Sequence, residues 1–581
     1  MDSRGIRTRL GNALYHGYEW IGQTVAGDLW EASESDGTGL GKMIHKASTR
    51  AKVDPRHIAW LRFLHQYIVY IEDASFIQQL EFNDALAGHD TTGVFGIFGK
   101  KNPRNLFAQP TESHQWRVGR SAFVNHLYML KALKKMTDPM HKIIDLYEKE
   151  ITELKGEMED IEDFTTRFTM DIIGKTQLAI EKFPIKQQRE FSRIINNVTT
   201  LIANPLHSIE AILPSSIRSL KACLRSSQKT KSLEELMQPA RDILLDVIKQ
   251  NEESILGTNN WLRDVSLQQI WCRKKAEERG LKEEEKWPDD VAKDKWFYEK
   301  ACKADWFKAI ENEEWPKALE GRSKEIIDIL YSPAMIDDAA LFLVVGHETS
   351  AKFFHYTLTL LADPAHKSIV QRLRDEVTTY LQEEKKSPEQ LTVDDLQKLP
   401  YCQAIAFEGL RLFPPVPLLK GQLTKDITFA EIGLCAHQSD YKEKMKKRNK
   451  AMDITLRKGS YVFISPLEFH HSKIYDNADA FDPKRFIDKK TGLLKKPDST
   501  MWIPFGDNQK RNCPGSKFAQ LEVLLALIRF FMKFDFLMDD KDRYTVTPKF
   551  TLQPGKQGIR AKVMPREEKG QEYEHVSPLS R

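Results

Sequence analysis

Apolar side chains recur at two different periods along the chain, which predicts both helices and a smaller set of strands. Residues 58–73 are rich in β-branched and aromatic side chains, and this pattern predicts two short strands joined by a tight turn. From Ser113 to about Leu236 the apolar positions recur every three or four residues, which predicts helices. The fold class expected is therefore mainly α with a smaller β region.

The longest predicted helix covers residues 333–363. It has no internal proline and is apolar almost all round, so it belongs in the centre of a large protein. Further helices are predicted over 364–382, over 393–413, where two prolines follow, and over the apolar segment 516–534. Residues 455–465 have the composition of a strand.

Charge and cysteine content narrow the function classes. The chain has 87 basic and 83 acidic residues, and this balance argues against a dedicated nucleic-acid-binding protein. Its six cysteines contain no CxxC pair, so neither a disulfide framework nor a zinc site is expected. No apolar run approaches the ~20 residues of a membrane span, and the N-terminus lacks the apolar core of a signal peptide. We expect a reduced, soluble, cytoplasmic protein, and peripheral attachment to a membrane remains open.

The strongest chemical signal is Cys513, in a loop directly before a predicted helix. A helix N-terminus carries partial positive charge, and Arg511 adds a full charge, so both favour the thiolate form. A thiolate held in this way can ligate a soft metal or a haem iron. The alternative is a buried structural cysteine, which is the usual state of a free cysteine.

A second signal is the pair Glu408 and Arg411, three residues apart on one face of a predicted helix. The rest of that helix is apolar, so the pair is expected to be buried and to need further partners. Arg485 is the predicted third member.

A third signal lies within the long apolar helix, where Gly346, His347, Glu348, Thr349 and Ser350 follow one another. An acid inside an apolar helix is costly unless it is paired or used. Glycine would let a ligand approach the backbone, and Thr349 can bond back to the preceding turn and open a groove. The alternative is a solvated kink.

Taken together and in this order, these motifs resemble the cytochrome P450 family from about Ile58 to Lys562. The resemblance implies a haem between the long central helix and the helix after the cysteine loop. It implies Cys513 as the iron ligand, and Glu348 and Thr349 as catalytic residues that relay protons to bound dioxygen. Trp116 and Arg120 match the family's W-x-x-x-R. The haem-binding residues implied are Trp116, Arg120, Gly346, Lys420, His470, Phe505 and Arg511.

The sequence departs from the family pattern at several of these positions. Cys513 lies eight positions after Phe505, where the family pattern has seven. Val345 stands where a smaller residue is usual. Lys420 stands near the position of a propionate-binding arginine and keeps the charge without the bidentate fork. His470 occupies a position where the family often has a haem-edge histidine.

The function implied is a haem-thiolate monooxygenase with haem b, which hydroxylates or epoxidises a mostly apolar small molecule. Neither a flavin domain nor an iron–sulfur cysteine cluster is recognised, so electrons derived from NAD(P)H are expected through a separate reductase or ferredoxin. A basic face around Lys510, Arg511 and Lys517 would suit an acidic donor. The alternatives are a peroxide-using isomerase, dehydratase or peroxygenase of the same fold, and a non-catalytic haem sensor.

We expect one P450 domain over residues 51–565, with an N-terminal extension over 1–50 and a polar tail over 566–581. Two insertions are expected within the domain. Residues 261–325 hold six of the eleven tryptophans. We interpret them as a charged helical insertion whose tryptophans pack it against the main body, or as a platform that binds a partner. Residues 436–453 are strongly basic and read as solvated surface, or as a docking site for an acidic partner or membrane.

One motif is a decoy. The segment 87–92 (AGHDTT) matches the family's oxygen-helix motif more literally than the segment at Gly346. However, it has no long apolar helix around it, and it precedes Trp116 in the chain. We interpret it as a coincidence in a substrate-access loop.

Overall fold

The fold is that of a computed structural model of the full chain. It describes Ile77, Ile270 and residues 39–53, 58–63, 66–71, 86–88, 114–154, 156, 158–203, 233–258, 260–267, 323–423, 425–429, 454–499, 501–506, 511–538, 543–555 and 559–566. The glycine-rich segment 93–99, most of the two predicted insertions and nearly all of both termini lie outside these residues.

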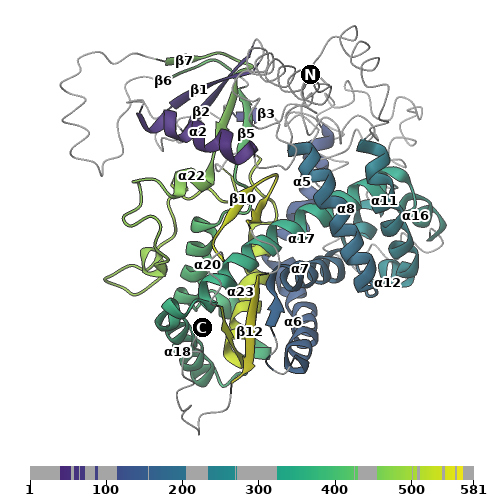
Figure 1. The fold of residues 1–581 in the computed structure, drawn as a ribbon. Helices are drawn as coiled ribbons and strands as arrows, with labels where there is room; N and C mark the ends of the chain where they lie inside the picture. Colours follow the sequence, from purple (N-terminus) through teal and green to yellow (C-terminus); the bar gives the residue numbers. More distant parts are fainter. Residues whose placement is uncertain are drawn as a thin grey trace, which may run out of the picture.

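The centre of the molecule is the helix α17, Pro333–Ala362, as predicted. Ser332 caps its start by accepting from the backbone N–H of Met335, and Pro333 occupies the first turn, where its missing N–H costs nothing. From Ala351 to Ala362 every residue of α17 is buried. Figure 1 shows α17 running through the body, surrounded by other helices.

Three of the helices that pack directly on α17 position the site: α7 Ile161–Gln177, α20 Pro400–Leu412 and α23 Ser516–Lys533. The crossing of α20 depends on Gly409, because a Cβ there would overlap the side chain of Thr357 on α17. Aromatic rings fill the interface, with Phe354 of α17 stacked on Phe530 of α23 at 6.1 Å between centroids. The remaining described helices are α2 Gly39–Val53, α5 His114–Leu127, α6 Leu130–Glu153, α8 Ile185–Ala203, α11 Leu233–Gln250, α12 Glu252–Gly257, α16 Ser323–Leu330, α18 Lys367–Glu384, α19 Val393–Leu396, α22 Pro466–His470 and the 3₁₀ helices η6 Pro364–His366, η7 Pro388–Gln390 and η8 Pro483–Phe486.

The strands gather mainly in one sheet at the end of the molecule opposite α18 (Figure 1). Its order is β1-β2-β8-β5-β3. The predicted hairpin over 58–73 is confirmed as an antiparallel β1–β2 pair, and β8 joins β2 in parallel. The sheet strands are β1 Ile58–Phe63, β2 Gln66–Ile71, β3 Leu86–Gly88, β5 Leu419–Leu423 and β8 Tyr461–Ile464.

Smaller sheets complete the β structure, so the mainly α prediction with a smaller β region is confirmed. The short hairpin β10–β11 packs near the site, and β12 pairs with both β4 and β9. These strands are β4 Met158–Asp160, β6 Ile427–Phe429, β7 Ile454–Leu456, β9 Phe534–Leu537, β10 Val546–Pro548, β11 Leu552–Pro554 and β12 Arg560–Pro565.

Two local predictions change with the structure. The single helix predicted over 393–413 is two helices, because α19 ends at Leu396 and Pro400 starts α20. A proline fits well in the first turn of a helix, where its missing N–H costs nothing. The decoy segment begins in β3, a strand paired with β5, and its residues 89–92 lie outside the described part.

The start of the Trp-rich segment is anchored in the core. Trp261 is 2% exposed. Its ring stacks on Phe342 of α17 at 4.6 Å between centroids and lies 5.2 Å from Phe123 of α5. For Trp261, the predicted packing against the main body is confirmed.

Candidate haem-thiolate site

Cys513 lies at the end of a loop that is tied back on itself. Its backbone N–H donates to the carbonyl of Phe505 at 2.9 Å, and Gly506 makes the turn with φ of +110°, a conformation that favours glycine. Gly515 caps α23, and a Cβ built there would lie 3.8 Å from the Cys513 sulfur. The predicted position of the cysteine, in a loop directly before a helix, is confirmed.

The thiol of Cys513 can be reached from outside but is largely surrounded by protein. The residue is exposed, yet burial by the surrounding protein is the largest influence on its thiol and raises its pKa. A backbone hydrogen bond from Gly515 and the charge of Arg120 lower the pKa in turn, but they do not outweigh burial.

A cation from a distant helix also acts on Cys513. Besides Arg511, which the sequence predicted to favour the thiolate, the charge of Arg120 on α5 lowers the pKa of this thiol. Arg120 donates through Nη2 to the backbone carbonyl of Asn512 at 2.6 Å, which ties α5 to the cysteine loop. Burial lowers the pKa of Arg120.

Trp116 joins the two arginines of this site. The Arg120 and Arg511 guanidinium carbons lie 5.5 and 5.1 Å from the centre of its ring, within cation–π range. Trp116 itself is 6% exposed. The structure thus brings together four residues that the sequence assigned to one site, although they come from elements about 390 residues apart.

These four residues suit a haem. A thiol that a ligand can reach offers one soft axial donor to iron. Two guanidinium groups close to it offer the fork-shaped donors that carboxylates prefer, and a haem carries two propionate carboxylates. Phe505 belongs to the same loop and is half-buried, and the centre of its ring lies 5.9 Å from that of Trp502. Residues 507–510, including the extra loop position and Lys510, lie outside the described residues.

Glu348 and Thr349 point to different partners. Thr349 donates from Oγ1 to the carbonyl of Val345 at 2.7 Å, so the predicted bond to the preceding turn is confirmed. Glu348 is 5% exposed. Its Oε1 accepts from Thr551 Oγ1 at 2.5 Å and from Gln553 Nε2 at 3.1 Å. Burial raises the pKa of Glu348, and the two hydrogen bonds and the charge of Lys352 oppose this shift.

The missing side chain of Gly346 serves helix packing. A Cβ at this position would lie 2.7 Å from Cδ1 of Ile173 on α7. Thr169 of α7 also donates to the carbonyl of His347 at 3.0 Å, so α7 occupies the space beside this turn. We predicted that Gly346 lets a ligand approach the backbone; the element that approaches is α7.

His470 and Lys420 are the remaining residues that were predicted to bind the haem. Both ring nitrogens of His470 are engaged by the backbone: Nδ1 bonds the carbonyl of Arg411 at 3.1 Å, and Nε2 accepts from the N–H of Ile503 at 3.0 Å. This geometry leaves no ring nitrogen for a propionate and does not support the predicted haem-edge role. Lys420 lies in β5 opposite Phe463; its side chain is outside the described part.

The buried ion pair is confirmed with its third partner. Arg411 donates to the two oxygens of Glu408 at 2.7 and 2.8 Å, and both side chains have no exposed area. Arg485 donates to Glu408 Oε1 at 3.1 Å. Arg411 also donates to the carbonyls of His470 and Ala480. The cluster therefore fixes α20 to the segment that leads toward the cysteine loop.

Comparison with known proteins agrees with this site. The model of the family described as "Cytochrome P450" matches residues 33–287, 335–435 and 441–560. The chain belongs to the cytochrome P450 family. Membership implies an oxidoreductase with a haem whose iron is bound by a cysteine thiolate. The breaks in the match fall at 288–334 and 436–440, within or overlapping the two segments that we interpret as insertions.

Individual relatives are distant. Cytochrome P450 6a2 of Drosophila melanogaster is 28% identical over 211 residues, 36% of each chain. Probable cytochrome P450 6a13 of the same organism is 22% identical over 540 residues, 91% of this chain and 90% of the relative. A self-sufficient cytochrome P450 monooxygenase of Oidiodendron maius is 29% identical over 255 residues, 43% of this chain and 20% of that protein. Several of these alignments thus span much less than two thirds of the relatives they match.

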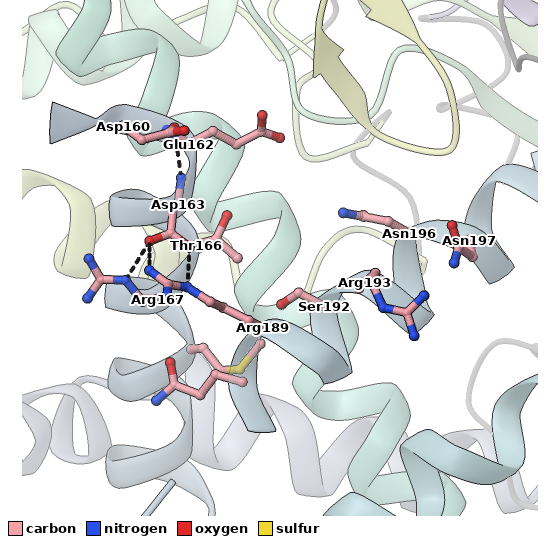
Figure 2. A pocket seen from close by; sticks show the side chains of 12 residues that line it. Asp160, Glu162, Asp163, Thr166, Arg167, Arg189, Ser192, Arg193, Asn196 and Asn197 are labelled. Atoms are coloured by element: carbon pink, nitrogen blue, oxygen red, sulfur yellow. Dashed lines mark hydrogen bonds and ion pairs between the residues drawn. The ribbon is translucent and has the colours of Figure 1, made fainter. Parts of the chain in front are cut away.

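A polar groove lies apart from this site. A groove of about 410 Å³ lies between α7 and α8, and Figure 2 shows that polar and charged side chains line it. Asp163 pairs there with both Arg167 and Arg189. None of the predicted haem or catalytic residues lines the groove, and its lining does not suit an apolar substrate.

Among the described residues, no single helix has the length and apolar composition of a membrane span. The bent pair of α16 and α17 meets both criteria only when the two helices are joined across a 63° bend.

Proposed function

We propose that this protein is a haem b monooxygenase that uses dioxygen to hydroxylate or epoxidise a mostly apolar organic molecule. The observation that carries the proposal is the assembly of Cys513, Trp116, Arg120 and Arg511 around one loop, in a chain of the P450 family. When bound, the haem supplies the iron at which dioxygen is reduced and split.

The protein's own residues bind, orient and deliver protons. Cys513 would hold the iron, and Arg120 and Arg511 would bind the two carboxylates of the cofactor by charge-assisted hydrogen bonds. Thr349, whose hydroxyl now donates to the carbonyl of Val345, would be the residue of α17 that donates a proton during the reaction. Glu348, whose pKa is raised by burial, would be the carboxyl that replaces the proton that Thr349 gives up.

Electrons are proposed to come from NAD(P)H through a separate redox protein. A donor with an acidic surface would complement Arg511 and the exposed Lys517 at the start of α23. Reconstitution of NADPH-dependent turnover with a purified reductase or ferredoxin tests this part. Turnover by the chain alone with NADPH would contradict it.

The thiolate assignment is tested by the reduced carbon-monoxide spectrum of the haem-loaded protein. We expect the red-shifted Soret band of a thiolate-bound haem, its loss in Cys513→Ala, and its retention in Cys402→Ala, the matched change at a buried free cysteine. A wild-type spectrum without that band would reject the function. The apolar substrate class is tested by a spectral-shift screen of lipids, sterols and aromatic compounds.

Thr349→Ala tests the proton delivery. We expect NADPH consumption to become uncoupled from product formation, because the Thr349 hydroxyl that would donate the proton is lost. Coupling equal to that of the wild type would show that Thr349 plays no part in the relay.

A further inference from the structure

The two partners of Glu348 come from a hairpin that lies about 200 residues further along the chain. Thr551 immediately precedes β11 and Gln553 lies within it, two positions apart and so on one face of the strand. Leu552 between them faces the other way and is fully buried, and its N–H donates to the carbonyl of Pro415 at 2.8 Å. The hairpin is therefore fixed before any ligand binds.

The hydrogen bonds in this group have a defined direction. Gln553 Nε2 donates to Thr551 Oγ1 at 2.6 Å and to Glu348 Oε1 at 3.1 Å. Because Thr551 Oγ1 already accepts from Gln553, its own proton is directed to Glu348 Oε1, 2.5 Å away. Oε1 thus accepts two hydrogen bonds.

The second carboxyl oxygen of Glu348 is in a different state. Among the residues that the structure describes, Oε2 is buried and has no hydrogen-bond partner. A buried carboxylate oxygen without a partner is costly, and this cost falls when the oxygen carries a proton. Oε1 is already saturated by donors, so a proton on this carboxyl resides on Oε2.

We propose that Thr551 and Gln553 are positioning residues for Glu348, which hold Oε1 against the hairpin and leave Oε2 as the oxygen that carries the carboxyl proton. This inference rests on the proposed function, in which Glu348 supplies protons to Thr349. It adds two residues and one oxygen atom that no motif in the sequence identifies.

Nearby charges agree with a carboxyl that exchanges protons. Lys352, one turn further along α17, favours the ionised form of Glu348, and Glu162 of α7 opposes it. These two charges pair with each other at 2.7 Å, so their effects on Glu348 partly cancel. The protonation equilibrium of Glu348 then depends on two opposing effects. Burial favours the protonated form, and the two hydrogen bonds from the hairpin favour the ionised form.

The test is infrared difference spectroscopy on the resting, haem-loaded protein, because a protonated carboxyl has its own C=O band. Subtracting the spectrum of Glu348→Gln isolates the band of Glu348 between about pH 5 and about pH 9. The pH at which half of this band is lost is the titration midpoint of Glu348. In Thr551→Val this midpoint should rise by about one pH unit or more, because a hydrogen-bond donor to the ionised carboxylate is lost. The band itself should move to higher wavenumber, because the C=O at Oε1 loses a hydrogen bond.

Two further variants separate positioning from folding. Thr551→Ser keeps the hydroxyl and should restore both the midpoint and the band position. Thr547→Val makes the same change on the paired strand, opposite Gln553, and should leave both unchanged. Retention of the thiolate Soret band in each variant shows that the haem site is intact.

The proposal is overturned if Thr551→Val has the wild-type band and midpoint, or if the wild type shows no Glu348 band over that range. It is also overturned if Thr547→Val shifts the midpoint as much as Thr551→Val. These infrared measurements need no catalytic turnover. The positioning role of Thr551 and Gln553 can therefore be refuted without refuting the proposed monooxygenase activity. A wild type without a thiolate Soret band rejects the monooxygenase and leaves the infrared result standing.

Discussion

Replacement of Glu408 by glutamine tests whether the buried ion pair holds the core together. In the native protein Arg411 makes two hydrogen bonds to Glu408, two to backbone carbonyls, and a cation–π contact with Tyr475 at 5.0 Å. Glu408→Gln removes the only carboxylate among these groups. It also turns an amide N–H₂ toward a guanidinium that can only donate.

The magnitude follows from the burial. Breaking one partner of a fully buried pair costs about 3–5 kcal/mol, because the remaining charge stays desolvated. Arg485 would also lose its carboxylate, although it keeps its bond to the carbonyl of Asn477. An unfolding entropy of about 2.1 cal/mol/K per residue over ~500 residues corresponds to about 1 kcal/mol per degree. We therefore expect the melting temperature to fall by about 3–5 °C.

The control is the same kind of substitution at an exposed pair. Lys134 and Asp394 are 2.6 Å apart, but their side chains are 47% and 53% exposed. Solvent screening limits such a pair to about 0–1 kcal/mol, so Asp394→Asn should lower the melting temperature by no more than about 1 °C. Circular dichroism melts of the haem-loaded variants measure both. If Glu408→Gln costs no more than Asp394→Asn, burial does not make this pair essential, and the reasoning fails.

Three further outcomes are expected. Gly346→Val should destabilise the protein by about 1–3 kcal/mol in urea unfolding, and the second change Ile173→Ala should relieve part of this loss; no relief would contradict the packing role. Burial lowers the pKa of His347 to about 4, so its neutral form stabilises the fold above about pH 6.5, and up to about 3 kcal/mol is lost as the pH falls toward 4. His347→Gln should flatten this pH dependence in urea titrations, and an unchanged slope would argue against it. Trp261→Ala should lower stability by about 3–5 kcal/mol, whereas a cost below 1 kcal/mol would mean that the ring stack with Phe342 does not anchor the segment.

The sequence predicted best those features that depend on neighbours within one or two helical turns. The apolar pattern located α17 and α23 within one residue of their ends. The spacing of Glu408 and Arg411 predicted their contact, since residues three apart share a helix face, and the apolar helix around them predicted their burial. The loop around Cys513 was recognised for the same reason: its residues are close together in the chain.

Contacts between distant segments were beyond the sequence. Thr551 and Gln553 lie 203 and 205 positions from Glu348, and a threonine and a glutamine in a strand are ordinary residues. Their i, i+2 spacing indicates a shared face but not what that face meets. The effect of Arg120 on the Cys513 thiol was beyond the sequence for a related reason. Arg511 is near Cys513 in sequence, whereas Arg120 comes from α5.

The motif from Gly346 to Thr349 shows why a pattern on a helix gives the residues of a site and not their partners. Consecutive helical positions turn by about 100°, so four neighbouring residues face different directions. Gly346 faces α7, Glu348 faces the β10–β11 hairpin, and Thr349 bonds back within α17. A substitution at any one of them therefore perturbs a different neighbour. The proton relay proposed for Glu348 and Thr349 thus depends on the hairpin as much as on the helix, and loss of Thr551 should affect it even though α17 is unchanged.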